Sequence, residues 1–401
     1  MPIIENPAFQ RAKSDLDWIH IAPSASFPPQ SGSWNHLVWE LLTTTHQRQA
    51  LVTSGDYLTD SITALDIPIC ASSTNIASGR VDRLRATIAR RVRPTKKRRH
   101  VEVVKELADL IGPAPSCNFV VWEKPYLISE VRRCFNDSTI VFSQRSFPTA
   151  AAHPVDHYDD ADVVVFQTDG QLRQVLTTFG SLTAQARVIP NGVDTERFHP
   201  PQERERRDAR TRLGIPDHPK LVAYPSTLKR KKGLATVEEL ANLAAQTGWF
   251  HLVVAQGMGG LSVDERQIAA PVMRRLRSNS SVTLLDGLDQ SLMHLLYQAT
   301  HLTIMPGLCL EGFSMAMLES LACGTPVIAP NIATFDELLE HQVTSLLVPA
   351  GSSAAEYARL IHELTDEDLS RLGSAARQTV VERYQRPHIV AAYHDTMKEF
   401  S

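Results

Sequence analysis

Short runs of apolar, often β-branched residues recur along the whole chain, and helix-like segments separate them. In the first half these runs are Trp18–Ala22, Ala50–Thr53, Phe119–Trp122, Thr139–Phe142, Val163–Phe166 and Arg187–Ile189. In the second half they are Leu221–Tyr224, His251–Ala255, Val282–Leu285, Leu302–Met305, Val327–Ala329 and Leu346–Val348. Such runs are typical of buried parallel strands, and their alternation with helices predicts doubly wound α/β sheets.

The stretch Phe198–Pro219 separates the two series of strands. It carries several prolines around a highly charged run, so we interpret it as an interdomain linker followed by a short exposed helix. Two helices are expected at the end of the chain, over Leu369–Tyr384 and Pro387–Phe400. Ligands of open α/β sheets bind outside the carboxyl ends of the strands. Two sheets facing each other would therefore hold their ligands in a cleft between domains.

A chain of 401 residues exceeds one ordinary domain, and two domains can each bury a core. The sequence predicts a first domain over residues 1–197, completed by the helix 387–401. It predicts a second domain over residues 198–386.

Composition excludes several classes of protein. A formal net charge of -3 argues against a general nucleic-acid binder. The five cysteines lack any CxxC spacing, which is typical of a reduced intracellular protein without a structural zinc site. The first residues lack a signal-peptide pattern, and no apolar stretch approaches the length of a membrane span. We therefore expect a cytoplasmic protein.

The segment Met305–Pro330 carries the most specific pattern. A strand ends at Met305, a Pro-Gly turn follows, and a helix is expected to begin near Gly312, where its free N–H groups would suit a diphosphate. Glu311 and Glu319 lie about 12 Å apart if the chain between them is helical. That distance fits a nucleotide-sugar, with Glu311 at the sugar hydroxyls and Glu319 at the ribose. Two glutamates eight residues apart on a helix are, however, often solvent-exposed residues without a function.

Three segments carry a resemblance to a known family. EGFSMAMLESLACGTPVIA resembles the E-x7-E signature of the family 4 glycosyltransferases, and VIPNGVDTERFHP is similar to the motif that closes the first domain of that family. VTLLDGLDQSLMHLL extends the likeness through the second half. The resemblance implies the GT-B fold, with two facing Rossmann-like domains, of which the first binds the acceptor and the second binds the nucleotide-sugar. It also implies retaining, metal-independent transfer from a nucleoside-diphosphate sugar, such as a UDP-sugar, without a cofactor.

The same resemblance implies roles for individual residues. Glu311 and Lys232 take catalytic positions, and the arginine that usually precedes the Lys-Gly pair is replaced by Thr227. Arg230, Lys231 or Lys229 are candidates to compensate for it. The remaining donor-binding candidates are Gly32, Gly287, Leu288, Gly312, Phe313, Ser314, Met315 and Glu319.

The acceptor side departs from the family, because Ser143 stands where a histidine is usual. Glu123 and Arg145 are the acceptor-side candidates, with Asp169 as an alternative. Asp160 and Asp162 imitate a metal-binding DxD motif, but they directly precede a strand and are better interpreted as a turn. The departures leave two alternatives open, a nucleotide-sugar-binding protein without turnover and a GT-B epimerase or phosphorylase.

The segment Arg80–Arg99 contains ten Lys or Arg residues and one acidic residue. It is interpreted either as a solvated loop or as a contact with anionic phospholipid at the inner face of a membrane, or with a phosphate-bearing acceptor. No aromatic residue interleaves the charges, so nucleic acid is not an expected partner.

We predict that the chain sediments with vesicles containing anionic lipid and not with neutral vesicles, because each basic residue near an anionic surface contributes about 1 kcal/mol. Sedimentation at matched ionic strength checks this prediction. Binding that is indifferent to the charge of the lipid would contradict it.

Overall fold

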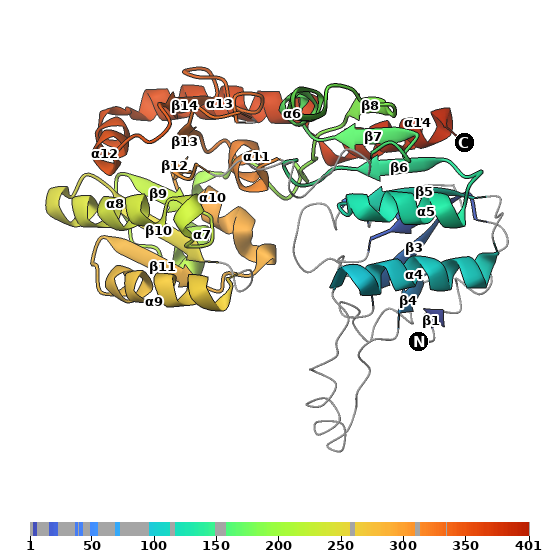
Figure 1. The fold of residues 1–401 in the computed structure, drawn as a ribbon. Helices are drawn as coiled ribbons and strands as arrows, with labels where there is room; N and C mark the ends of the chain where they lie inside the picture. The colour runs from blue at the N-terminus through green and yellow to red at the C-terminus, as the bar shows by residue number, and fades with distance from the viewer. Residues whose placement is uncertain are drawn as a thin grey trace, which may run out of the picture. The chain divides into compact units, whose positions relative to one another are not determined.

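A computed structural model describes most of the chain and divides it into two compact units (Figure 1). The described residues are 3–5, 16–22, 37–38, 40–42, 49–54, 69–72, 96–112, 117–148, 158–256, 261–308, 313–333 and 335–400. The first unit is Met1–Pro190 with Ile389–Ser401, and the second is Asn191–His388. The sequence had placed these divisions after residues 197 and 386.

The first unit is built on an eight-stranded sheet in the order β1-β4-β3-β2-β5-β6-β7-β8. All neighbouring strands are parallel except β1 and β4. The strands are β1 (Ile3–Glu5), β2 (Trp18–Ile21), β3 (Gln49–Ser54), β4 (Ile69–Ser72), β5 (Asn118–Trp122), β6 (Ile140–Ser143), β7 (Val163–Phe166) and β8 (Gln185–Val188). Every strand predicted for this half is present, while β1 and β4 were not predicted.

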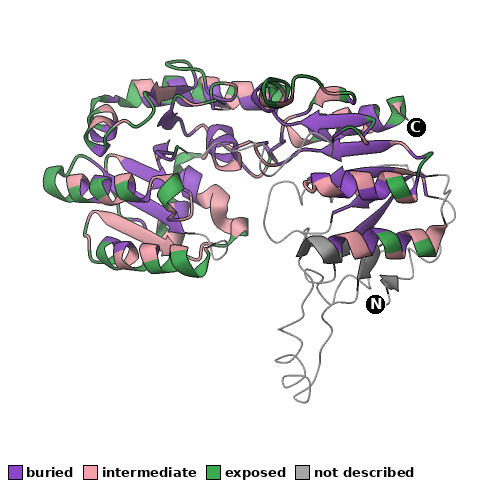
Figure 2. Cartoon of the chain, in the orientation of Figure 1, coloured by how far each residue is buried: buried purple, intermediate pink, exposed green. Residues whose placement is uncertain are grey.

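Helices cover both faces of this sheet. On one face lie α4 (Lys96–Ile111), the short η3 (Pro125–Leu127), α5 (Ile128–Cys134) and α6 (Asp169–Phe179). On the other lies α14 (Arg386–Glu399), which packs its apolar residues against β2, β5, β6 and β7. The strands β2, β5, β6 and β7 are therefore buried on both sides, which explains their nearly continuous apolar sequences (Figure 2).

The second unit is built on a six-stranded parallel sheet in the order β11-β10-β9-β12-β13-β14. The strands are β9 (Leu221–Tyr224), β10 (His251–Gln256), β11 (Val282–Asp286), β12 (Leu302–Ile304), β13 (Val327–Pro330) and β14 (Ser345–Val348). All of them were predicted from the apolar runs.

Two helical layers enclose the second sheet. One contains α8 (Leu234–Thr247), α9 (Val263–Arg277) and α12 (Ala354–Glu363). The other contains α7 (Glu203–Leu213), α10 (Met293–Ala299), α11 (Met315–Ala322) and α13 (Asp366–Arg383). Short helices η5 (Arg230–Lys232) and η6 (Gln290–Leu292) lie in the loops.

The interpretation of residues 198–219 as an interdomain linker is wrong. The predicted helix is present as α7, but Ala209 on it is buried and the helix packs on α10. Arg206 and Arg210 of α7 donate hydrogen bonds to the carbonyls of Thr300 and Ala299, at 3.1 and 3.0 Å. The segment is part of the second unit because its buried apolar residues and two of its arginines, Arg206 and Arg210, contact that unit.

Within the described ranges, no helix is long and apolar enough to cross a membrane.

The tightest backbone approach in the second unit joins α13 to the turn after α11. A Cβ on Gly373 would meet the carbonyl oxygen of Gly324 at 2.1 Å. We predict that Gly373→Ala lowers the free energy of unfolding by about 1–3 kcal/mol or more, because overpacking forces two backbones apart. Urea denaturation measures the effect, with Ser374→Ala on the exposed face of α13 as the control. Equal stability of the two variants would contradict the prediction.

Candidate functional site

The strand order of the second sheet reverses between β9 and β12. The strands after β9 extend the sheet in one direction and the strands after β12 extend it in the other. Open α/β sheets bind ligands where the strand order reverses, at the carboxyl ends of the strands. The loops that follow β9 and β12 therefore form the first place to look for a site.

These two loops contact each other through glycines. A Cβ on Gly233 would lie 2.8 Å from Cγ of Pro306, and a Cβ on Gly307 would lie 2.7 Å from Cα of Lys232. Gly233 also has a φ of +86°, in the left-handed region that favours glycine. The Lys-Gly turn after β9 thus packs directly on the Pro-Gly turn after β12. The structure brings together two segments that the sequence had assigned to the donor.

Lys232 is held at this contact by its backbone. Its carbonyl accepts a hydrogen bond from the Tyr224 hydroxyl at 3.0 Å, and its side chain is half-buried. Thr227 is also half-buried, and its carbonyl accepts from the backbone N–H of Lys229 at 2.8 Å.

The other cations of the turn differ in their surroundings. Lys229 forms an ion pair with Glu265 at 3.3 Å, whereas Arg230 and Lys231 are exposed. Arg230 and Lys231 are therefore better placed than Lys229 to replace the arginine missing at position 227.

The helix α11 begins at Met315, with Ser314 as its N-cap, and not near Gly312 as expected. Ser314 is buried, and its hydroxyl has no hydrogen-bond partner among the described residues. Phe313 packs its ring 5.8 Å from that of Tyr384, and Met315 packs on the core. The first turn of α11 thus presents open backbone N–H groups beside a buried hydroxyl, an arrangement that suits an anionic oxygen.

Glu319 is the fifth residue of α11 and is buried, with only 6% of its surface exposed. Its carboxylate accepts hydrogen bonds from the Tyr297 hydroxyl at 3.2 Å and from the Gln290 amide at 3.3 Å. Burial raises the pKa of Glu319 to about 7, although the hydrogen bond from Tyr297 and the charge of Arg197 act in the opposite direction. Tyr297 and Gln290 were missed, because nothing in their local sequence distinguishes them from ordinary helix and turn residues.

Gly287 and Leu288 form the turn after β11, further along the same edge of the sheet. Gly287 has a φ of +80°, and its N–H donates to the carbonyl of Gln256 at 2.8 Å. Leu288 packs against the core. This hydrogen bond ties the turn to the end of β10. A planar ligand could stack against the backbone of the turn.

In the first unit the two acceptor-side candidates lie at the carboxyl ends of neighbouring strands. Glu123 follows β5 with a φ of +65°, a conformation that costs energy for a residue with a Cβ, and it pairs with Lys124 at 2.9 Å. Arg145 follows β6 and is buried. Its guanidinium donates to the Tyr393 hydroxyl at 3.2 Å and lies 5.8 Å from the Trp122 ring centre.

Beneath Trp122 lies a satisfied polar network. The Trp122 indole donates to Nδ1 of His20 at 3.2 Å, and Nε2 of His20 lies 2.8 Å from the Gln49 amide oxygen. Burial lowers the pKa of His20 to about 4, so the ring is neutral and holds its proton on Nε2. The network fixes the ends of β2 and β5, next to the point where the strand order reverses.

Three of the predicted site residues lie outside the described residues: Gly32, Glu311 and Gly312. The basic segment Arg80–Arg99 is described only for the backbone of its last residues, which open α4.

Asp160 and Asp162 form the turn that was expected. The Asp162 carboxylate accepts from Arg132 at 2.6 Å and from the backbone N–H of Ile140 at 2.7 Å. No group of three or more His, Cys, Asp or Glu residues arranged to hold a metal is found in the part of the chain that the structure describes.

Comparison with known proteins agrees with this geometry. Residues 205–379 match the family model of glycosyl transferases group 1. A D-inositol 3-phosphate glycosyltransferase of Corynebacterium jeikeium is 28% identical over 216 residues, which are 53% of this chain and 51% of the relative. A protein of the same name from Mycobacterium tuberculosis is 28% identical over 57% of this chain and 45% of the relative. The chain is thus matched to about half the length of these curated relatives.

Solved structures extend the likeness in fold to almost the whole chain. Sucrose-phosphate synthase of Thermosynechococcus elongatus superposes with a TM-score of 0.74 at 19% identity, covering 96% of this chain and 98% of that one. The HepE protein of Anabaena, solved with UDP and glucose, superposes with a TM-score of 0.72 at 15% identity, covering 96% and 99%. The fold is therefore GT-B. The match to the glycosyl transferases group 1 model lies within the second unit and covers less than half of the chain.

The pKa of Glu319 generates a prediction about stability. Because the folded state holds this proton more tightly than the unfolded chain, the carboxyl group lowers the free energy of unfolding as pH rises from about 4.5 to above 7. Glu319→Gln removes the titration. We expect the free energy of unfolding of this variant to exceed that of the wild type by about 2 kcal/mol at pH 8, so that the variant melts at a higher temperature. At pH 5 we expect the two proteins to have nearly the same stability.

Thermal denaturation followed by circular dichroism at both pH values checks the prediction. Glu382→Gln, which changes an exposed glutamate on α13, is the control and should show no such pH dependence. A pH-independent difference between the wild type and Glu319→Gln would contradict it.

Proposed function

We propose that this protein transfers a glycosyl group from a UDP-sugar to an acceptor, with retention of the anomeric configuration. The observation that carries the proposal is the contact between the Lys232-Gly233 turn and the Pro306-Gly307 turn at the reversal of the strand order. It supports a single donor site that combines a cation, a helix amino terminus and a buried carboxylate. The UDP and UDP-glucose complexes of HepE support the choice of nucleotide.

In the proposed complex the uracil lies against the turn at Gly287 and Leu288. The ribose hydroxyls donate to the Glu319 carboxylate, which Tyr297 and Gln290 already orient. The diphosphate accepts from Lys232, from Ser314 and from the first N–H groups of α11. Glu311 takes the sugar hydroxyls.

Catalysis in this scheme comes from charge stabilisation and positioning. As the bond between the anomeric carbon and the phosphate oxygen breaks, negative charge grows on the diphosphate, and Lys232 with the dipole of α11 stabilises it. The acceptor attacks on the face that the diphosphate leaves, and its proton passes to the departing phosphate oxygen. These groups supply the positive charge without a metal ion, so we propose that transfer continues in EDTA.

For the acceptor we propose a small phosphorylated polyol as the first class to test. The curated relatives are named for inositol 3-phosphate. Arg145 supports this choice, because a buried guanidinium at the carboxyl end of a strand suits a phosphate oxygen. Tyr393 holds it from α14.

The donor site is tested by titrating UDP and 2′-deoxy-UDP into the protein. We expect Glu319→Ala to weaken UDP binding about 10- to 100-fold and to abolish the preference for UDP over 2′-deoxy-UDP, because hydrogen bonds to a charged group are lost. Lys232→Met should weaken binding of both nucleotides. Its control is Lys398→Met, which removes an exposed cation of α14 in the first unit and should change affinity little. Unchanged UDP affinity in both Glu319→Ala and Lys232→Met would overturn the assignment.

Turnover separates the proposal from its alternatives. Transfer or slow hydrolysis of UDP-glucose, with the configuration of the product read by NMR, supports the transferase. Tight binding of UDP without any turnover over a panel of donors and acceptors would favour a binding protein. Interconversion of the sugar within the nucleotide, or its release by phosphate, would favour an epimerase or a phosphorylase.

A further inference from the structure

The second unit contains a cavity of about 650 Å³ at the edge of its sheet opposite the donor loops. His301 directly precedes β12 and Thr325 closely precedes β13, so the cavity lies at the amino ends of the strands. Residues of α7 and α13 form its other walls. It is separate from the site proposed for the donor, which lies at the carboxyl ends.

Three arginines line this cavity: Arg206, Arg210 and Arg377. Arg206 is half-buried, and with the described residues it forms one hydrogen bond, to the carbonyl of Thr300, and no ion pair. Burial lowers the pKa of Arg206, and the neighbouring charge of Arg210 lowers it further, while the charge of the exposed Glu203 acts in the opposite direction. A cation that is partly desolvated beside another cation is unfavourable unless an anion joins them.

The other two arginines are fixed in place by backbone carbonyls. Arg377 donates to the carbonyls of Phe198 and Ala322 at 2.7 and 2.9 Å. It forms no ion pair within the described residues. Arg210 pairs with Asp217 at 3.0 Å, but Asp217 is largely exposed. These bonds preorganise the guanidinium groups and leave most of their charge without a buried counterion.

His301 adds a second, independent observation. Its Nδ1 accepts a hydrogen bond from the backbone N–H of Leu221 at 2.8 Å, and burial, the largest cause, together with nearby arginines lowers its pKa to about 4. A neutral ring that accepts on Nδ1 must carry its proton on Nε2. That Nε2 lies 2.9 Å from Nη2 of Arg210, which is also a donor.

Two donors therefore face each other across 2.9 Å, with no acceptor between them. The contrast with His20 is clear, since each nitrogen of that ring has the partner that its protonation requires. A single anionic oxygen beside Arg210 and His301 would accept from both groups and remove the mismatch.

We propose that this cavity binds a phosphate group, either as inorganic phosphate or as the phosphate of a small phosphate monoester. Guanidinium groups bind phosphate oxygens in pairs, and the Nε2–H of His301 supplies one further donor. The volume exceeds that of one phosphate, so a small organic group fits beside it. Glu203 and Asp366 also line the cavity, but both are exposed and lie at its rim. These two carboxylates would repel a long polyanion that extends to the rim, so the cavity favours a compact dianion close to the arginines.

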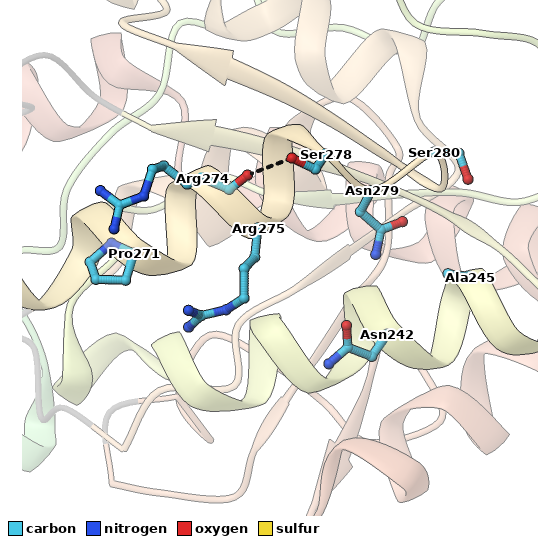
Figure 3. Close-up of a pocket in the computed structure, with 8 residues that line it drawn as sticks. All are labelled: Asn242, Ala245, Pro271, Arg274, Arg275, Ser278, Asn279 and Ser280. Carbon is cyan, nitrogen blue, oxygen red and sulfur yellow. Dashed lines mark hydrogen bonds between the residues drawn. The ribbon is translucent and has the colours of Figure 1, made fainter.

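A second hollow in the same unit provides a contrast (Figure 3). It lies between α8 and α9, and Arg274 and Arg275 border it. Arg275 forms an ion pair with Glu238, and the amide of Asn279 donates to the carbonyl of Ala241 at 2.9 Å. Arg274 is exposed to solvent. The polar groups here are paired or solvated, so this hollow does not need a bound anion to stabilise its charges. Arg274 is therefore used as the control position in the binding experiment.

The test is calorimetric titration of the full chain with inorganic phosphate and, separately, with glycerol 3-phosphate, at constant ionic strength set with chloride. We expect saturable binding that Arg206→Gln weakens about 10- to 100-fold and Arg274→Gln leaves unchanged. Tighter binding of glycerol 3-phosphate than of phosphate would identify a monoester as the ligand, and the reverse would identify free phosphate. Either result supports the site.

Two further variants keep the proposal falsifiable if Arg206→Gln folds poorly. Asp366→Asn removes a rim carboxylate and should tighten binding about two- to fivefold, because one repulsive charge is lost. Lys232→Met, in the donor loop, should leave phosphate binding unchanged. The proposal is overturned if neither probe binds, if Asp366→Asn has no effect, or if Lys232→Met abolishes binding, since the donor site would then account for it.

Discussion

The packing of one Lys-Gly turn on one Pro-Gly turn determines the rest of the second unit's site. Side chains at positions 233 and 307 would clash with the opposite turn at distances below 3 Å, so the contact exists only because both residues are glycine. It holds the loop after β9 against the loop after β12, and the latter leads into α11. The cation, the helix amino terminus and Glu319 thus belong to one rigid arrangement, built where the strand order reverses.

The fold was largely predictable from the sequence, because doubly buried parallel strands leave a strong local pattern. β9 to β14 are short apolar runs, each flanked by turns and helices, and each was found. β1 and β4 were missed because they are short and lie at the edge of the sheet, where a strand needs fewer apolar residues and so leaves a weaker pattern in the sequence. The linker interpretation failed for a related reason: the surface charge of α7 concealed Arg206 and Arg210, whose side chains donate to the carbonyls of Thr300 and Ala299 at the end of α10.

The site was predictable only in part. The residues of the E-x7-E segment, the Lys-Gly pair and the turn at Gly287 have local signatures, and the structure places Glu319, Lys232 and Gly287 along one edge of one sheet. The partners of Glu319 have no such signature, because Tyr297 and Gln290 approach it from other elements. Long-range pairing of this kind depends on tertiary packing, and a single sequence contains no record of it. The same holds for the arginines around the cavity on the opposite edge.

The helix α14 begins in the second unit and continues into the first. Its Ile389, Val390, Tyr393 and Met397 complete the core on one face of the first sheet. During synthesis on the ribosome, the part of that face that α14 covers has no partner until the whole second unit has been made, because α14 follows it in the chain. The first unit therefore cannot finish folding first, although it is translated first.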